Sequence, residues 1–285
     1  MHTHTFMRYY LIIYCCLLAI STYAQPANSY SHSDSLRAKQ YFDSSWNYSL
    51  GSQKHQLYLD SALMVLPTHA WYWQQKSMPL YKAHKFEAGK PFLDSAVKYD
   101  PGRWLDYAAF LECIYERNYY RSLKDFYTSR ALYGNKPVMD HPYNFFIGLC
   151  HLQLNHFDSS EYYFNSCIEE ARKTKGESWV HVNHLFYMGI VCYEKEEYTR
   201  AIGYFDKALA QYKRFSDAQY YKAICLYQLK KTKEALVCME EAEANFNAGY
   251  GLNEDNALYE YYPYQLRKYY LSGAVKKMRE AAAKK

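Results

Sequence analysis

The chain has 285 residues, 49% of them hydrophobic, and a formal net charge of +5. The hydrophobic content suffices for a continuous core and excludes a chain that is disordered throughout. The positive charge is dispersed along the sequence, which argues against nucleic acid as the partner because such proteins concentrate Lys and Arg in a stripe. The 35 tyrosines are unusual, and tyrosine suits half-buried helix faces and contact surfaces.

The first 24 residues are predicted to be an export signal. Arg8 precedes the apolar stretch 11–20, and the sequence Ser-Thr-Tyr-Ala at 21–24 offers a small-residue cleavage site. The apolar stretch is shorter than the roughly 20 residues that a spanning helix needs. We therefore expect an exported bacterial protein of the periplasm or cell envelope, or a secreted one, with no spanning helix after cleavage. A leader retained as an anchor is the alternative.

Residues 25–35 are polar and lack periodicity, which predicts a disordered linker. Beyond them, the sequence Leu-Asp-Ser-Ala occurs at 59–62 and again at 93–96, and each copy is followed by a proline, Pro67 or Pro101. The interval of 34 residues is the period of a helix–turn–helix repeat. Internal repetition therefore predicts a solenoid.

Small and large residues recur at the same interval. Gly189, Ala201 and Ala208 are followed 34 residues later by Ala223, Ala235 and Ala242. In these positions the chain resembles the tetratricopeptide repeat family from about residue 36 to 247. The resemblance implies an all-α fold, a right-handed superhelical solenoid of about six antiparallel helix hairpins with a C-terminal capping helix.

The repeat register predicts the boundaries of the hairpins. Gly148 and Gly189 lie 41 residues apart, so the second helix or the loop of the fourth hairpin is expected to be longer than usual. Residues 248–285 are expected to form a C-terminal cap and basic tail, with one or two helices separated by Pro263. The six hairpins are expected at 36–67, 70–101, 103–136, 141–180, 182–215 and 216–247.

Six cysteines follow the predicted cleavage site, and they stand singly on predicted helices with no CxxC pair. Cysteine is a common small buried residue, so we expect free thiols in the core. A disulfide between adjacent helices is the alternative, because an exported chain can form one. The residues are Cys113, Cys150, Cys167, Cys192, Cys225 and Cys238.

In the tetratricopeptide repeat family, the first helices of the hairpins line a concave groove that binds other proteins. Transferring that register places aromatic side chains along the groove, where they would anchor a peptide segment or helix. Packing of the same rings between hairpins is the competing interpretation. The residues assigned to the groove are Trp71, Tyr81, Trp104, Tyr107, Phe145, Phe186, Tyr193, Tyr220 and Tyr227.

The sequence contains no HExxH, CxxC, phosphate-loop or GxSxG motif. His181 and His184 are three residues apart on a predicted helix, but a metal site needs a third ligand. We interpret these histidines as surface or hairpin-turn residues, and His141, His151 and His156 likewise. No catalytic residue, metal or cofactor is expected.

The resemblance implies a protein–protein interaction scaffold of the cell envelope and not an enzyme. The expected partner is a protein, whose identity the sequence leaves open. One alternative is a module that binds carbohydrate or cell-wall fragments, with Trp71, Trp73 and Trp104 stacking on sugars. Another is a structural subunit that assembles with copies of itself.

Overall fold

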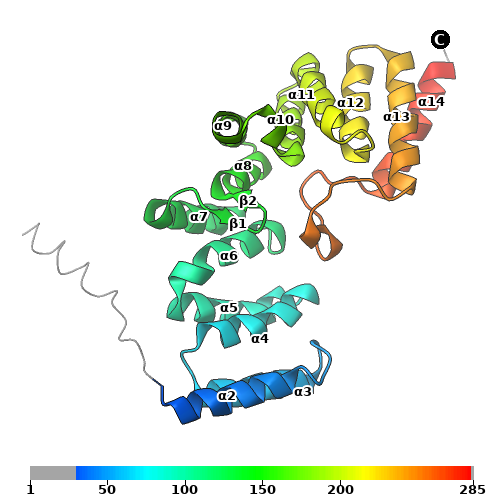
Figure 1. The fold of residues 1–285 in the computed structure, drawn as a ribbon. Coiled ribbons are helices and arrows are strands. Elements are labelled where there is room, and N and C mark those ends of the chain that lie inside the picture. Colours follow the sequence, from blue (N-terminus) through cyan, green and yellow to red (C-terminus); the bar gives the residue numbers. More distant parts are fainter. Residues whose placement is uncertain (1–29, 284–285) are drawn as a thin grey trace, which may run out of the picture. The chain divides into compact units, whose positions relative to one another are not determined.

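The computed structural model describes residues 30–283, which are almost entirely helical (Figure 1). The predicted signal at 1–24, and Lys284 and Lys285 of the predicted tail, lie outside these residues. Within the described part, twelve helices form six antiparallel pairs and one more helix follows them. The predicted all-α solenoid with a C-terminal helix is thus confirmed.

The paired helices follow one another along the chain with short connections. Two short strands, β1 (Pro137–Val138) and β2 (His141–Pro142), pair in the connection between α7 and α8. The helix pairs are α2 (His32–Ser45) with α3 (Gln53–Val65), α4 (Ala70–Lys82) with α5 (Phe86–Tyr99), α6 (Pro101–Ile114) with α7 (Tyr119–Tyr133), α8 (Tyr143–Gln153) with α9 (Phe157–Lys175), α10 (Val182–Glu194) with α11 (Tyr198–Gln211), and α12 (Ser216–Gln228) with α13 (Thr232–Asn247).

The described chain divides after Tyr72 into two compact units. The first unit contains α2, α3 and the start of α4, and its core includes Phe42, whose ring stacks on Tyr72 with centroids 5.1 Å apart. The second unit contains the rest of the hairpins and the C-terminal helix. The extra length of the fourth hairpin lies in α9, which has 19 residues, and in the short 3-10 helix η1 (Glu177–Trp179).

The predicted linker is wrong at its C-terminal end, because α2 begins at His32. The Ser31 hydroxyl accepts a hydrogen bond from the backbone N–H of Asp34 at 3.0 Å and donates one to the Asp34 carboxylate at 2.7 Å. Serine and aspartate in this arrangement cap a helix. The polar residues that suggested disorder are in part a helix start.

Small residues stand where the two helices of a hairpin approach most closely. Gly148 of α8 lies against the ring of Phe164 in α9, and Gly189 of α10 lies against Phe205 in α11. A Cβ atom at 189 would lie 2.5 Å from Cε1 of Phe205, closer than van der Waals contact permits. The small position of the repeat is therefore a packing requirement.

The C-terminal helix α14 (Lys268–Ala283) packs on α13 and closes the end of the second unit. Leu271, Val275 and Met278 of α14 are buried in a cluster with Met239 and Ala242 of α13. Such a helix covers the apolar face that the last hairpin would otherwise expose. Of the one or two helices expected in this part, the described residues form one α-helix, α14, and the short 3-10 helix η2 (Asp255–Leu258) precedes Pro263.

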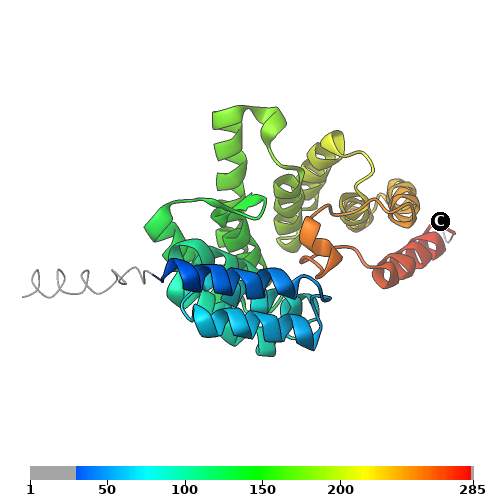
Figure 2. The same cartoon turned by 60° about the horizontal axis from the view of Figure 1, so that its bottom comes forward.

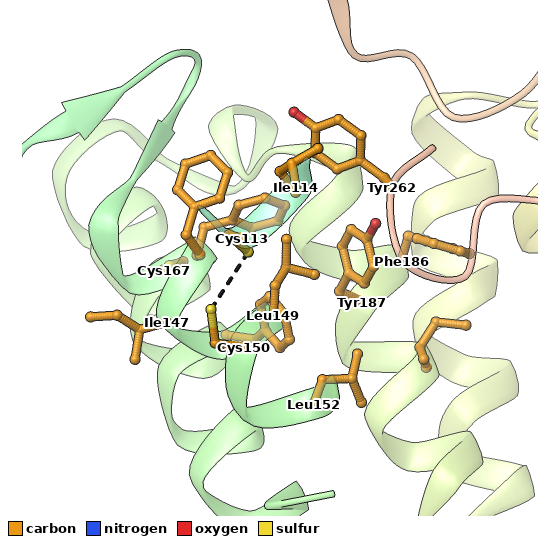
Figure 3. Packing of buried hydrophobic residues seen from close by; sticks show 14 of the residues in the cluster. Cys113, Ile114, Ile147, Leu149, Cys150, Leu152, Cys167, Phe186, Tyr187 and Tyr262 are labelled. Atoms are coloured by element: carbon orange, nitrogen blue, oxygen red, sulfur yellow. Dashed lines mark hydrogen bonds between the residues drawn. The ribbon is translucent and has the colours of Figure 1, made fainter. Parts of the chain in front are cut away.

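The six cysteines after residue 24 are buried and free, as predicted. Sγ of Cys113 in α6 lies 3.5 Å from Sγ of Cys150 in α8, inside the largest buried cluster (Figure 3).

None of the described helices combines the length and the apolar character needed to cross a membrane.

One carboxylate is buried in the second unit against two cations. Oε1 of Glu112 in α6 lies 2.6 Å from Nε of Arg121 and 3.3 Å from Nζ of Lys90. Burial raises the pKa of Glu112 to about 7, assisted by the charge of Asp125 and opposed by Lys90 and Arg121. The pKa of Glu112 is thus higher in the folded chain than in the unfolded chain. Protonated Glu112 therefore stabilises the fold fully below the ordinary pKa of glutamate, and this stabilisation is lost as the pH rises through 7.

We expect the substitution Gly189→Ala to lower the free energy of unfolding by about 1–3 kcal/mol, because the added methyl group collides with Phe205. Gly203→Ala is the matched control, since nothing lies within 4 Å of a Cβ there and alanine favours a helix interior by about 0.5–1 kcal/mol. Urea unfolding of both variants measures the difference. Equal effects would contradict the assigned close approach.

We expect the stability of the native chain, relative to Glu112→Gln, to fall by about 1–3 kcal/mol between pH 5 and pH 8. The reason is that the free energy needed to ionise the buried carboxyl exceeds the stabilisation from its ion pairs with Arg121 and Lys90. Urea unfolding of both proteins across this pH range measures it. A difference that grows in favour of the native chain as the pH rises would show that the ion pairs outweigh burial.

Candidate functional site

Residues 249–267, here called the return segment, leave α13, turn back toward α8 and α10, and then join α14 (Figures 1 and 2). Apart from η2 the segment is not helical. Gly249 begins it with a φ of 83°, a conformation that favours glycine. The segment lies along the first helices of the hairpins in the second unit, which is the face assigned to partner binding from the sequence.

Both ends of the return segment are held by one buried carboxylate. Oδ2 of Asp217, at the start of α12, accepts a hydrogen bond from the backbone N–H of Leu252 at 3.0 Å. Oδ1 accepts from the N–H of Leu266 at 2.7 Å. Burial raises the pKa of Asp217, and these two bonds with that from the Ser216 hydroxyl oppose the rise. A single side chain therefore closes the segment into a loop.

Tyrosine side chains hold the middle of the return segment. The Tyr187 hydroxyl donates to the carbonyl oxygen of Pro263 at 2.9 Å, and the Tyr264 hydroxyl donates to Glu194 at 2.8 Å. Tyr262 is only 3% exposed and belongs to the same buried cluster as Tyr187 and Ile114 (Figure 3). The tyrosine-rich composition thus serves both apolar burial and hydrogen bonding.

Charged and polar contacts fix residues 256–260 of the return segment. The Tyr115 hydroxyl donates to Oδ1 of Asn256 at 3.3 Å, and Nη2 of Arg117 lies 2.6 Å from Oε1 of Glu260. Burial raises the pKa of Tyr115 to about 12, with smaller effects of Tyr259 and Glu260, so its hydroxyl remains a donor at neutral pH. The segment is therefore bound along its whole length.

A pocket of about 460 Å³ remains between the return segment and helices α6, α10 and α12. Its walls combine tyrosine rings with charged side chains of both signs, a composition suited to peptide side chains. The residues that line it include Arg117 in the connection after α6, then Tyr119, Gln153, Tyr193, Glu194, Tyr220 and Ile224 on the helices, and on the other side Tyr261, Gln265, Arg267 and Tyr270.

The groove prediction is wrong for four of its nine residues. Tyr81, Trp104, Phe145 and Phe186 are buried in the core and present no surface to a partner. Phe186, for example, packs on Phe205 and Phe215 with ring centroids 6.1 and 5.0 Å apart. These rings fill the space between consecutive hairpins, which is the competing interpretation that the sequence left open.

The other five residues are half-buried and lie in different surroundings. Tyr193 and Tyr220 line the pocket. Tyr227 packs against the cluster of α13 and α14, and the Tyr107 hydroxyl lies 2.5 Å from the sulfur of Met78. Trp71 belongs to the first unit, where it packs on Phe42.

The sequence analysis missed the return segment and the residues that bind it. The break in the repeat at Gly249 and Gly251 was a signal that the chain leaves the helical pattern, but it did not reveal where the segment goes. It also missed that His141, assigned to a turn or surface, is buried beside His184 of α10 and His181, which precedes that helix.

We expect Asp217→Asn to release the return segment, because an amide cannot accept both backbone hydrogen bonds as the carboxylate does. Amide hydrogen exchange in residues 249–267 should accelerate at least tenfold while the helices keep their protection. Asp206→Asn is the control, since Asp206 is half exposed and pairs only with Lys222 at 2.7 Å among its charged neighbours. Unchanged exchange would show that Asp217 does not hold the segment.

No protein-family model matches the sequence, and no curated protein matches it. Among solved structures, PilW, a type IV pilus biogenesis factor, superposes with a TM-score of 0.59 at 12% identity over 76% of this chain and 95% of PilW. A tetratricopeptide repeat protein from Parabacteroides merdae gives 0.55 at 14% identity over 92% of this chain and 90% of that one.

Cut9, in the APC/C hetero-tetramer Cut9–Hcn1, gives a TM-score of 0.58 at 12% identity over 87% of this chain. The match spans only 43% of the Cut9 chain. Likeness at this identity concerns the fold and not the activity. The pairing of the helices, the contacts of the small residues and the likeness to these structures agree that the chain has the fold of tetratricopeptide repeat proteins.

Proposed function

We propose that the chain is a protein-interaction scaffold whose second unit binds an extended segment of a partner protein. The observation that supports this most is that the inner face of the hairpins already holds a non-helical stretch of polypeptide, the return segment. A surface that binds one such stretch through its side chains has the chemistry needed to bind another.

The inner face of the hairpins offers two kinds of contact, one to backbone atoms and one to side chains. Asp217 and Tyr187 bind backbone atoms of the return segment, so their contacts depend little on its sequence. The pocket beside it has a volume of about 460 Å³ and offers the rings of Tyr193 and Tyr220. Rings of this kind are the usual anchors of interfaces. We place the partner's side chains in this pocket, next to the return segment.

The proposal is for binding and not for catalysis, and it places the chain in a bacterial cell envelope. That location rests on the export signal predicted in residues 1–24. The carbohydrate-binding alternative loses one of its three tryptophans, because Trp104 is buried, while Trp73 and Trp71 are half-buried against Phe92 and Phe42. Self-assembly remains an outcome of the test below.

The proposal is tested by placing a photo-crosslinking amino acid at Tyr220 in the pocket, in the cells that make the protein. The control position is Tyr162 of α9, which is 65% exposed and does not line the pocket. We expect one heterologous protein to crosslink from position 220 and not from 162. Mass spectrometry should map the crosslinks to one continuous segment of that protein.

A synthetic peptide with the mapped sequence should bind the purified chain, and Tyr193→Ala with Tyr220→Ala should weaken binding at least tenfold. Tyr162→Ala should leave the affinity unchanged, and thermal unfolding should show that all variants fold. Crosslinks only between copies of the chain would indicate self-assembly instead. Equal capture from both positions would contradict a specific pocket.

A further inference from the structure

Three histidines from two separate parts of the sequence meet in the second unit. His141 belongs to β2, in the connection before α8, while His181 precedes α10 and His184 lies in its first turn. His141 is 1% exposed and His184 is 5% exposed, and His181 is half-buried. One ring nitrogen of each histidine lies within 4.8 Å of those of the other two.

The spacing of the rings fits a tetrahedral metal ion. With metal–nitrogen distances of about 2.0–2.1 Å, two ligand nitrogens on a tetrahedral ion lie about 3.3 Å apart and the ring centroids about 5 Å apart. Nδ1 of His141 lies 3.2 Å from Nε2 of His184. The ring centroids are 4.7 Å apart for His141 and His181, 5.3 Å for His141 and His184, and 5.4 Å for His181 and His184.

Glu254 of the return segment orients the first of these rings. Nε2–H of His141 donates to Oε1 of Glu254 at 2.7 Å, and Nδ2 of Asn183 donates to the same oxygen at 2.5 Å. A proton on Nε2 leaves the lone pair on Nδ1, which faces His184. Metal-binding histidines are commonly held in this way by a carboxylate on their other nitrogen.

Nδ1 of His184 and Oδ1 of Asn183 are buried and have no hydrogen-bond partner among the described residues. The nitrogen of His184 that faces the cluster is Nε2, which lies within hydrogen-bond distance of Nδ1 of His141, so an ion would replace that hydrogen bond. Imidazole binds metals in its neutral form, through the nitrogen that carries no proton.

We propose that His141, His181 and His184 bind one divalent transition-metal ion of the zinc class, with solvent as the fourth ligand. His181, the most accessible of the three, completes the site by turning its ring. This turn breaks the hydrogen bond that its Nδ1 accepts from the N–H of Asn183 at 3.2 Å. Through Glu254 the ion strengthens the binding of the return segment to α10. The inference goes beyond the proposed function and does not depend on it.

The test is a titration of the full, metal-free chain with Co²⁺, whose visible absorption distinguishes four-coordinate from six-coordinate ions. We expect one equivalent to bind with the strong absorption of a tetrahedral site. Zn²⁺ should displace it, raise the Tm and slow amide exchange in residues 249–267. His141→Gln and His184→Gln should each weaken binding at least 100-fold, with circular dichroism showing that the variants fold.

The matched control is His151→Gln combined with His156→Gln, since these two rings also lie close, with their Nδ1 atoms 3.3 Å apart, but on the surface. This variant should bind Co²⁺ as the native chain does. If the core variants do not fold, His181→Gln and Glu254→Gln test the site instead. We expect them to weaken Co²⁺ binding by at least 100-fold and by about tenfold, respectively. Binding that is six-coordinate, unchanged by these substitutions, or abolished by the surface variant would overturn the proposal.

Discussion

The carboxylate of Asp217 is the contact on which the arrangement of the second unit depends. It is buried, and it accepts backbone hydrogen bonds from Leu252 and Leu266, residues that lie 14 positions apart in the chain. An ionised group placed in the core is tolerated when such bonds replace its hydration. By fixing both ends of the return segment, Asp217 sets the position of the pocket, brings Glu254 to the histidines and directs the chain into α14.

The return segment changes how a partner can use the inner face of the hairpins. A segment tethered at both ends competes with any free peptide at a high effective concentration. For the proposed partner, the segment leaves space in the pocket between Tyr193, Tyr220 and Tyr270. The inner face of the hairpins therefore differs from an open groove, because the return segment already covers part of it.

The histidine cluster and Glu112 both place polar groups in the core, where such groups need hydrogen-bond or ionic partners. Glu112 is buried with two cationic partners, Arg121 and Lys90, and retains a raised pKa. Among the described residues, His184 is buried with one nitrogen unpaired. Unsatisfied polar groups are expensive in a protein core, and they are retained where they act. Both sites keep such an atom, Oε2 of Glu112 and Nδ1 of His184. The imidazoles point to a ligand for another reason, because one nitrogen of each of the three rings lies within 4.8 Å of those of the other two.

The sequence by itself predicted the fold, because its small and large residues recur at the 34-residue interval of the repeat family that the chain resembles. The structure shows the physical reason for that pattern at Gly189, where the two helices of a hairpin touch. The sequence also predicted that the cysteines are core residues. Periodicity could not decide which aromatic rings face outward, since Phe145 and Tyr193 occupy similar first-helix positions and only the winding of the hairpins buries one of them. The meeting of His141 with His184, and of Asp217 with residues 252 and 266, was decided by tertiary structure alone. Each of these contacts joins a residue of a repeat helix to a segment outside the repeat, and no periodic pattern relates the two residues.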